Sequence, residues 1–144
     1  MGFPPNRNRH LAMELKNHTY MTRKRLLGRD TSNYQKYQDL IIGKRGFFNL
    51  FKYELITTLS SWVPGALGLL LRARLYRLLI GGTGRGVVFG KNVTLRHPHK
   101  VFLGDNVIID DNCLIDAKGN DNKGIVIGDN VFIGRNTILL CTDG

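Results

Sequence analysis

A five-residue motif recurs between residues 87 and 144 and constrains the fold of this chain more than any other feature. Each copy holds an aliphatic or aromatic residue, then Gly or Asp, any residue, Asn, and a small or β-branched residue. Neighbouring copies begin six residues apart, and so short a period is typical of stacked β-helix coils rather than of helical repeats. The five copies are Phe89-Gly90-Lys91-Asn92-Val93, Leu103-Gly104-Asp105-Asn106-Val107, Ile109-Asp110-Asp111-Asn112-Cys113, Ile127-Gly128-Asp129-Asn130-Val131 and Ile133-Gly134-Arg135-Asn136-Thr137, and a weaker sixth, Ile115-Asp116-Ala117-Lys118-Gly119, has Gly in place of Asn.

Apolar residues in the same region come in pairs spaced two apart, the pattern of a short strand with one buried face. Three residues between successive pairs must turn the chain, and Asn, Asp and Gly tolerate the positive φ that such turns often need. Three strands complete one triangular coil, so successive coils stack their strands in parallel. We count eight pairs, less than three full coils: Val87/Phe89, Val93/Leu95, Val101/Leu103, Val107/Ile109, Cys113/Ile115, Ile125/Ile127, Val131/Ile133 and Thr137/Leu139.

The six-residue register slips at two places. About two extra residues occur within residues 96–100, and about six occur between Ile115 and Ile125. Insertions at turns leave the buried column intact, so we expect both to project from a corner of the coil stack. Repeat proteins usually place binding residues at such insertions.

The excess of positive charge lies in the front part of the chain, which we divide into residues 1–44 and 45–86, ahead of the β-helix at 87–144. Residues 1–86 carry fifteen Lys/Arg against four Asp/Glu, whereas residues 87–144 carry six against seven. We interpret residues 1–44 as a basic, mobile tail with one short helix near residues 34–42. The alternative is attraction of this tail to anionic lipid headgroups. We expect no nucleic-acid partner, because the basic residues alternate with aliphatic residues rather than with stacking aromatic ones.

Residues 45–86 predict a helical segment. Seventeen consecutive uncharged residues, 55–71, reach the lower limit for crossing a bilayer, but Pro64-Gly65 in their middle favours a break into two shorter helices. Three interpretations stay open: helices that cap the β-helix, a hairpin lying in the membrane surface, and a true span. After the break, one helical stripe contains Leu67, Leu71, Leu75 and Leu78. Arg72, Arg74 and Arg77 lie off this stripe.

Residues 45–144 resemble the front of bacterial hexapeptide-repeat acyltransferases of the kind that O-acetylate polysaccharide sugars. The resemblance rests on two runs, WVPGALGLLLRARLYRLLIG (62–81) and VVFGKNVTLRHPHKVFLGDNVIIDDNCLIDAKG (87–119). It implies a mainly β fold, a left-handed parallel β-helix behind an α-helical N-terminal segment, and assembly as a homotrimer. It also implies acetyl-CoA as acyl donor, held between neighbouring coils, and a His that acts as general base while backbone N–H groups stabilise the oxyanion.

In that family the catalytic His lies in a later coil, so we expect the base beyond residue 144. The chain ends within a coil, without a segment that would cover the exposed edge. We therefore expect a fragment of a longer enzyme, inactive by itself. Its cofactor-binding residues stay unassigned.

Two histidines in the repeat region are catalytic candidates. His97 and His99 flank Pro98 in the irregular first turn, where a polar turn, contact with substrate, and a metal site are the alternatives. A zinc site would need a third ligand, and we expect no metal. Asp110, Asp111 and Asp116 are expected to be turn formers, with a functional carboxylate as the alternative. Cys113 is expected to fill an inward position, and His10 and His18 are assigned no role.

The leading hypothesis is an acetyltransferase of polysaccharide or cell-envelope biosynthesis, acting on a sugar or lipid-linked saccharide. Cys113 and Cys141 form no CxxC pair, and the first 30 residues lack the apolar core of a signal peptide. We therefore expect a cytoplasmic protein that can contact the anionic inner membrane peripherally. The alternatives are a non-catalytic β-helix scaffold or oligomerisation module, and a metalloenzyme resembling γ-class carbonic anhydrases.

Overall fold

The computed structural model describes residues 31–119 and 122–141, and the chain divides into two compact units, residues 1–36 and 37–144. In the first unit, the described residues 31–36 include the start of helix α2 (Asn33–Tyr37). The Lys36 N–H donates to the Ser32 oxygen over 3.0 Å. The predicted tail thus lies mostly outside the described residues, as do His10 and His18. The helix expected near residues 34–42 is present as α2 and the π-helical turn η1 (Gln38–Ile42).

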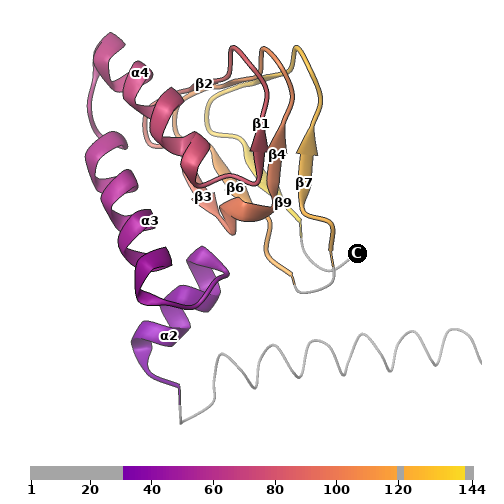
Figure 1. Cartoon of the computed structure of the whole chain (residues 1–144). Coiled ribbons are helices and arrows are strands. Elements are labelled where there is room, and N and C mark those ends of the chain that lie inside the picture. The colour runs from indigo at the N-terminus through magenta and orange to yellow at the C-terminus, as the bar shows by residue number, and fades with distance from the viewer. Residues whose placement is uncertain (1–30, 120–121, 142–144) are drawn as a thin grey trace, which may run out of the picture. The chain divides into compact units, whose positions relative to one another are not determined.

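The second unit contains a left-handed parallel β-helix of three coils, as the repeat and the resemblance predict (Figure 1). Each coil contributes one strand to each of three parallel sheets, ordered β1-β4-β7, β2-β5-β8 and β3-β6-β9. The strands are β1 (Gly82–Thr83), β2 (Val88–Phe89), β3 (Thr94–Arg96), β4 (Val101–Leu103), β5 (Ile108–Ile109), β6 (Leu114–Asp116), β7 (Ile125–Ile127), β8 (Phe132–Ile133) and β9 (Ile138–Leu140).

Our count of less than three coils is wrong by one strand. β1 pairs in parallel with β4 through Gly82 and Phe102. It escaped detection because Gly82–Thr83 lacks the pair of apolar residues that marks the other strands. The β-helix therefore begins inside the segment 45–86.

The two predicted register slips are confirmed by the strand pairing. Three regular hexapeptides would separate stacked residues by eighteen positions, but Val88 pairs with Ile108, twenty positions on, and Ile108 pairs with Phe132, twenty-four positions on. The first insertion forms the 3₁₀ turn η3 (Pro98–Lys100), and the second lies between β6 and β7, where residues 117–119 and 122–124 are described. Both insertions follow a strand of the sheet β3-β6-β9, so they share one corner of the stack.

The inward pairs form one apolar column. All members of the first five predicted pairs are at most 5% exposed, whereas most members of the last three pairs, in the third coil, are half-buried. Each of the five repeated Asn residues adopts a left-handed conformation, with φ between 55° and 61°. These two observations confirm the interpretation of the repeat as strand pairs joined by Asn turns.

Hydrogen bonds between stacked turns reinforce the regular corners. The Asn106 side-chain amide donates to Asn130 Oδ1 over 3.2 Å, and Asp129 Oδ1 accepts from the Asp105 N–H over 2.7 Å. Asn92 donates in the same way to Asn112. Because the same residue type recurs at the same offset, each turn satisfies polar groups of its neighbour.

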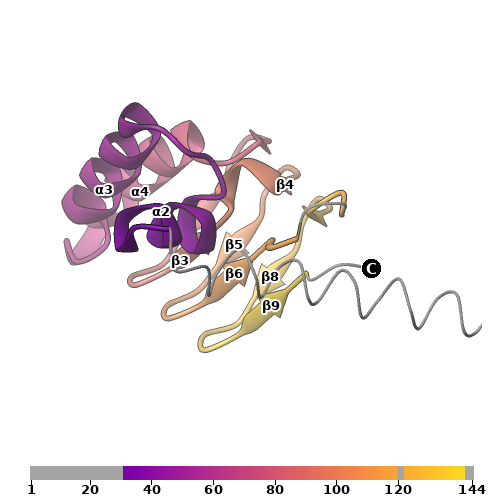
Figure 2. The same cartoon turned by 90° about the horizontal axis from the view of Figure 1, so that it is seen from below.

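Helices cover the coil-one end of the stack, as Figure 2 shows. They are α3 (Phe47–Ser60), α4 (Gly65–Leu75) and the 3₁₀ turn η2 (Tyr76–Leu78). The expected break occurs at Pro64, which is extended and directly precedes α4. Tyr53 of α3 donates to the Leu95 oxygen over 2.8 Å, and Tyr76 donates to the Val93 oxygen over 3.3 Å. The helices thus pack against the first coil, as the capping interpretation expects.

The buried face of α4 differs from the predicted leucine stripe. Leu67 and Leu78 are 64% and 56% exposed, whereas Arg72 is 3% exposed. The i, i+4 pattern that faces the coil is Gly68, Arg72 and Tyr76, because the Arg72 guanidinium finds carbonyl acceptors there.

Within residues 31–119 and 122–141, no helix combines the length and apolar character needed to cross a membrane.

Candidate functional site

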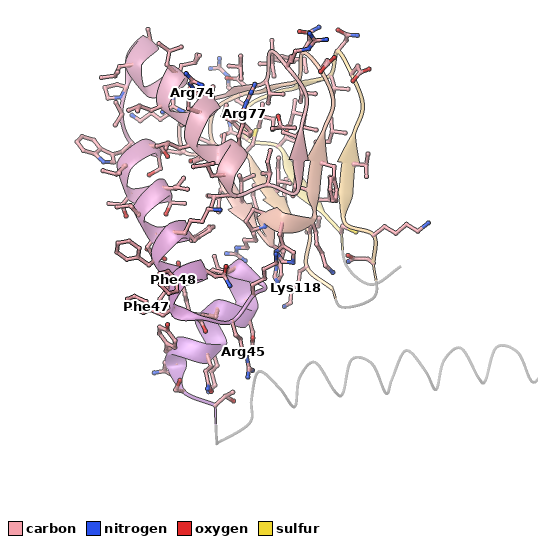
Figure 3. The ribbon with its side chains drawn as sticks, in the orientation of Figure 1. Arg45, Phe47, Phe48, Arg74, Arg77 and Lys118 are labelled. Carbon is pink, nitrogen blue, oxygen red and sulfur yellow. The ribbon has the colours of Figure 1, made fainter. Side chains whose placement is uncertain are left out.

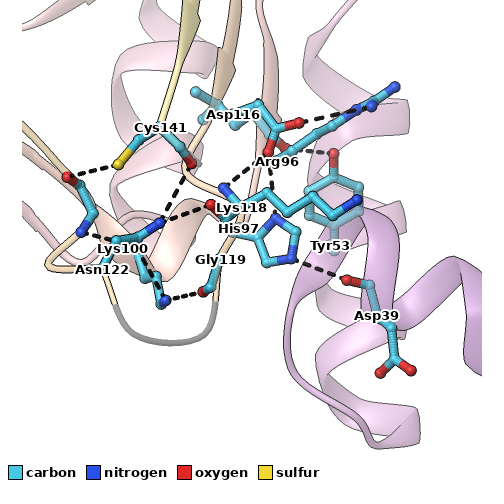
Figure 4. Close-up of polar contacts among 12 residues, drawn as sticks. Asp39, Tyr53, Arg96, His97, Lys100, Asp116, Lys118, Gly119, Asn122 and Cys141 are labelled. Carbon is cyan, nitrogen blue, oxygen red and sulfur yellow. Dashed lines mark hydrogen bonds and ion pairs between the residues drawn. The ribbon is translucent and has the colours of Figure 1, made fainter. Parts of the chain in front are cut away.

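The irregular corner that follows β3, β6 and β9 brings together His97, Asp116 and Cys141, three of the residues singled out from the sequence (Figure 4). We call it the polar corner. It consists of His97, His99, Lys100, Asp116, Lys118, Asn122 and Cys141. The turns at the other two corners are regular, with Asn in the left-handed position except in the turn before β2, where Gly86 takes that position, and they carry no insertion.

His97 connects the polar corner to the N-terminal helices. It adopts a left-handed conformation (φ 52°), and its N–H donates to the Ile41 oxygen over 2.7 Å. The imidazole is buried, with Nε2 3.0 Å from the Asp39 backbone oxygen and Nδ1 3.5 Å from Asp116 Oδ1. A carbonyl oxygen only accepts, so Nε2 is the protonated nitrogen in that contact. Nε2 is thus held by a backbone oxygen of this chain, whereas Nδ1 lies at ion-pair distance from Asp116 and makes no hydrogen bond among the described residues.

His99 lies beside His97, with ring centroids 6.4 Å apart. Burial lowers the pKa of His99, and the positive charges of Lys44 and Lys100 lower it further. The lowered pKa favours the neutral imidazole at pH 7. A neutral imidazole is a competent base, but this one is half-buried against the turn after η1.

Asp116 is the buried carboxylate of the corner. Its Oδ1 accepts from the Lys118 N–H over 3.1 Å, and its Oδ2 lies 3.8 Å from Arg96 Nη1. Its backbone oxygen accepts from the Cys141 N–H over 2.9 Å, which links the second and third coils. Asp116 thus contacts the start of the second insertion, His97 and the third coil. The sequence predicted only a role in a turn.

The described parts of the second insertion, residues 117–119 and 122–124, contact one another and the corner. The Lys100 ammonium donates to the Gly119 oxygen and to Asn122 Oδ1, the latter over 3.3 Å. The Asn122 amide in turn donates to the Lys118 oxygen over 2.7 Å and to the Cys141 oxygen over 3.4 Å. These contacts connect Lys100, the described parts of the second insertion and the end of the third coil.

Other residues singled out from the sequence lie away from this corner. Asp110 and Asp111 occupy a regular turn, where Asp111 Oδ1 accepts from the Lys91 N–H over 2.6 Å and Asp110 Oδ1 accepts from the Asp111 N–H over 2.8 Å. Cys113 points into the column, is 1% exposed, and donates to the Gly134 oxygen over 3.2 Å. These three residues shape turns and core.

The described residues contain no set of side chains that could bind a metal ion. No three His, Cys, Asp or Glu side chains in those residues are grouped so that they could hold an ion. His97 and His99 are close together, but the additional ligand required for zinc is not grouped with them. The metalloenzyme interpretation therefore has no observation in its favour.

Sequence reasoning missed a hollow between α3 and the first coil. It has a volume of about 260 Å³, and its lining includes Tyr53, Thr57, Tyr76, Asn92 and Thr94. The Tyr53 hydroxyl is bonded to the Leu95 oxygen, and burial raises the Tyr53 pKa. No spacing in the sequence indicates this hollow, because its walls come from segments about 40 residues apart.

Comparison with known proteins gives one solved structure of interest. No family model matches the chain, and no curated protein sequence matches it. A hexapeptide-repeat containing acetyltransferase from Vibrio cholerae O1 biovar eltor, complexed with acetyl coenzyme A, is similar at 22% identity with a TM-score of 0.48. The match covers 61% of this chain and 44% of that protein, so this chain spans less than half of its length.

Proposed function

We propose that this chain belongs to an acyltransferase that moves an acetyl group from acetyl-CoA to a sugar hydroxyl. The observation that carries the proposal is the hexapeptide coil stack with both insertions gathered at one corner. The runs 62–81 and 87–119, which resemble sugar O-acetyltransferases, agree with it, and so does the acetyl-CoA bound by the Vibrio cholerae protein. Fold alone does not give chemistry, so the activity rests on the experiment below.

The proposed reaction needs a base and a stabilised oxyanion. The acceptor oxygen attacks the thioester carbonyl carbon, and the base takes the hydroxyl proton. The tetrahedral intermediate then collapses, the carbon–sulfur bond breaks, and the CoA thiolate leaves and takes up a proton. Backbone N–H groups can stabilise the oxyanion between these two steps.

We propose that a further coil or a second subunit supplies that base. His97 has both ring nitrogens directed at oxygens of its own chain, and His99 packs against the η1 turn. In the third coil, Ile125, Ile127 and Leu139 are half-buried, whereas Val101 and Ile115 of the second coil are fully buried. An additional coil stacked on β7, β8 and β9 would bury that column and extend the groove between coils.

Homotrimeric assembly is part of the proposal. Outward-facing apolar residues on the third coil support contact with another chain, since Val126, Phe132 and Ile138 are each more than 60% exposed on the three different sheets. Light scattering on the purified protein measures the mass directly. A monomer at micromolar concentration would remove this part of the proposal and leave the chemistry open.

Binding of acetyl-CoA tests the proposal. Calorimetry is carried out on the protein expressed from its complete reading frame, with acetyl-CoA as ligand and ATP as a control for nucleotide binding. We expect saturable binding of acetyl-CoA and a weaker response to ATP. A well-folded protein that takes up no acetyl-CoA would contradict the proposal.

A non-catalytic scaffold is the second candidate. The observation in its favour is that the His and Lys side chains of the polar corner contact groups of their own chain. The reading frame separates the two candidates. A stop codon directly after Gly144 favours the scaffold, whereas more hexapeptides with a His-bearing loop favour the enzyme.

A further inference from the structure

Helix α3 has two apolar faces, and the coil stack uses only one of them. Tyr53, Ile56 and Ser60 are buried against the first coil. A second stripe lies on the solvent side, at spacings that place its α3 members within about a quarter of the helix circumference, and Trp62 follows just after the end of α3. It consists of Phe48 (85% exposed), Phe51 (54%), Leu55 (46%), Leu59 (53%) and Trp62 (66%).

The stripe continues as aromatic contacts at the start of α3 and as leucines on α4. Phe47 stacks on Phe51 with ring centroids 6.1 Å apart, although both rings are more than half exposed. Figure 3 shows Phe47 and Phe48 on the side of α3 remote from the strands. On α4, Leu67 and Leu70 are 64% and 63% exposed. Single exposed leucines are ordinary, but a continuous stripe indicates an interaction surface.

Positive charge accompanies this apolar surface. Residues 40–104 contain ten Lys/Arg and a single acid, Glu54, which accepts a hydrogen bond from Tyr37. Lys52 lies one helical turn from both Phe48 and Leu55, and Arg74 lies one turn beyond Leu70. Both cations are exposed.

We propose that the outer face of α3 and α4 docks on an anionic lipid surface. The docking face consists of Phe47, Phe48, Phe51, Leu55, Leu59, Trp62, Leu67 and Leu70, with Lys52 and Arg74 as its cations. The apolar side chains enter the boundary between headgroups and acyl chains, and the cations pair with lipid phosphates. This docking does not depend on the acyltransferase activity proposed above.

The geometry requires the helices to lie flat on that surface. The Tyr53–Leu95 hydrogen bond and the Arg72–Phe89 hydrogen bond hold the opposite faces of α3 and α4 on the coil stack. The helices therefore present their outer stripe side-on. Trp62, at the end of the stripe, has the amphipathic ring typical of membrane interfaces.

Charge also favours lipid over a second copy of the chain as occupant. Two docking faces brought together would juxtapose Lys52 and Arg74 with the same cations of the other copy. The one acid of this region, Glu54, is bonded to Tyr37 and cannot neutralise them without losing that contact. Like charges at an interface oppose association, whereas lipid phosphates compensate them.

The wild-type protein provides the first test, because Trp62 is the single tryptophan of the chain. Vesicles of equal parts phosphatidylcholine and phosphatidylglycerol are added, and Trp62 emission is recorded with and without brominated acyl chains. We expect a blue shift and quenching by the brominated lipid. Protein that sediments with the vesicles while Trp62 emission stays unchanged would overturn the proposal, because attachment would then occur elsewhere.

Substitutions test which side chains bind the vesicle surface. The triple variant Phe48→Gln, Phe51→Gln and Leu55→Gln removes apolar surface from the stripe while circular dichroism verifies the fold. The matched control, Phe102→Gln, Ile108→Gln and Leu140→Gln, alters exposed apolar side chains on the coil stack that are not assigned to the proposed contact between subunits. We expect vesicle affinity to fall at least about tenfold in the first variant and to stay near wild type in the control.

Two further results would overturn the proposal. Equal loss in both triple variants would show that the stripe has no special role. A change of molecular mass in the stripe variant with unchanged vesicle binding would identify the face as a contact between copies. The double variant Lys52→Gln, Arg74→Gln should bind more weakly to vesicles that contain phosphatidylglycerol. Unchanged binding would contradict the proposed contact of Lys52 and Arg74 with lipid phosphates.

Discussion

The buried Arg72 guanidinium donates through Nε to the backbone oxygen of Phe89, 2.9 Å away. Its Nη1 also donates to the oxygens of Ser60, at 3.1 Å, and Val63, at 2.8 Å. Arg72 thus connects α4 to strand β2 of the first coil and to the segment that follows α3. These bonds supply acceptors for a cation that would otherwise be buried without partners.

Arg72→Leu should lower the free energy of unfolding by about 3 kcal/mol, because three buried carbonyl contacts lose their donor. Arg74→Leu on the same helix is the control, and its exposed side chain predicts a change within about 0.5 kcal/mol. Urea denaturation measures both values. Equal, small effects of the two substitutions would contradict the role assigned to Arg72.

Asn112 tests the left-handed turns. Gly and Asn tolerate its φ of 59°, whereas Ala adopts it only at a cost. Asn112→Ala and Asn112→Gly both lose the hydrogen bond from Asn92, so the difference between them isolates the backbone conformation. We expect Ala to be less stable than Gly by about 1 kcal/mol in denaturant unfolding. An Ala variant as stable as the Gly variant would argue against turn conformation as the reason for the repeated Asn.

Gly43 tests the packing of His97 on the helices. Both Gly43 and Gly65 have positive φ, 73° and 70°. A Cβ on Gly43 would lie 2.2 Å from His97 Cδ2, whereas a Cβ on Gly65 meets nothing within 4 Å. Gly65→Ala should therefore lower the midpoint of thermal unfolding only through the backbone, and Gly43→Ala should lower it further. Identical midpoints would mean that His97 does not pack as described.

His99 predicts a pH dependence of stability. Burial lowers its folded-state pKa below the ordinary value of 6.5, so the unfolded chain binds the proton more readily. The stabilising contribution of neutral His99 is present above pH 6.5 and is lost as pH falls from there toward the folded-state pKa. The difference in unfolding free energy between the wild type and His99→Gln should decrease over that window. A difference that grows on acidification would contradict a lowered pKa of His99 in the folded state.

The coil stack was predictable because its signals are local. Strand pairs such as Val107/Ile109, the Asn turns, and both insertions follow from residue type and spacing. β1 was missed because Gly82 and Thr83 carry no apolar signal, and only pairing with β4 identifies it. The burial of Arg72 was missed because its acceptors, such as the Phe89 oxygen, come from a distant segment.

The candidate site could be predicted in position but not in chemistry. The sequence located His97 and His99 at an insertion, and the structure places them at the polar corner with Asp116. It did not indicate that the His97 ring nitrogens face the Asp39 and Asp116 oxygens, since residues 58 positions apart meet there. Whether a histidine is free to act as a base depends on such contacts, which spacing along the chain does not encode.

Transfer of labelled acetyl groups tests the central claim most directly. The protein from the complete reading frame is incubated with acetyl-CoA that carries a labelled acetyl group and with a panel of sugars and lipid-linked saccharides. The account predicts that the label appears in a saccharide ester and that free CoA forms in equal amount. Label that stays in acetyl-CoA with every acceptor, although the protein is folded, would contradict it.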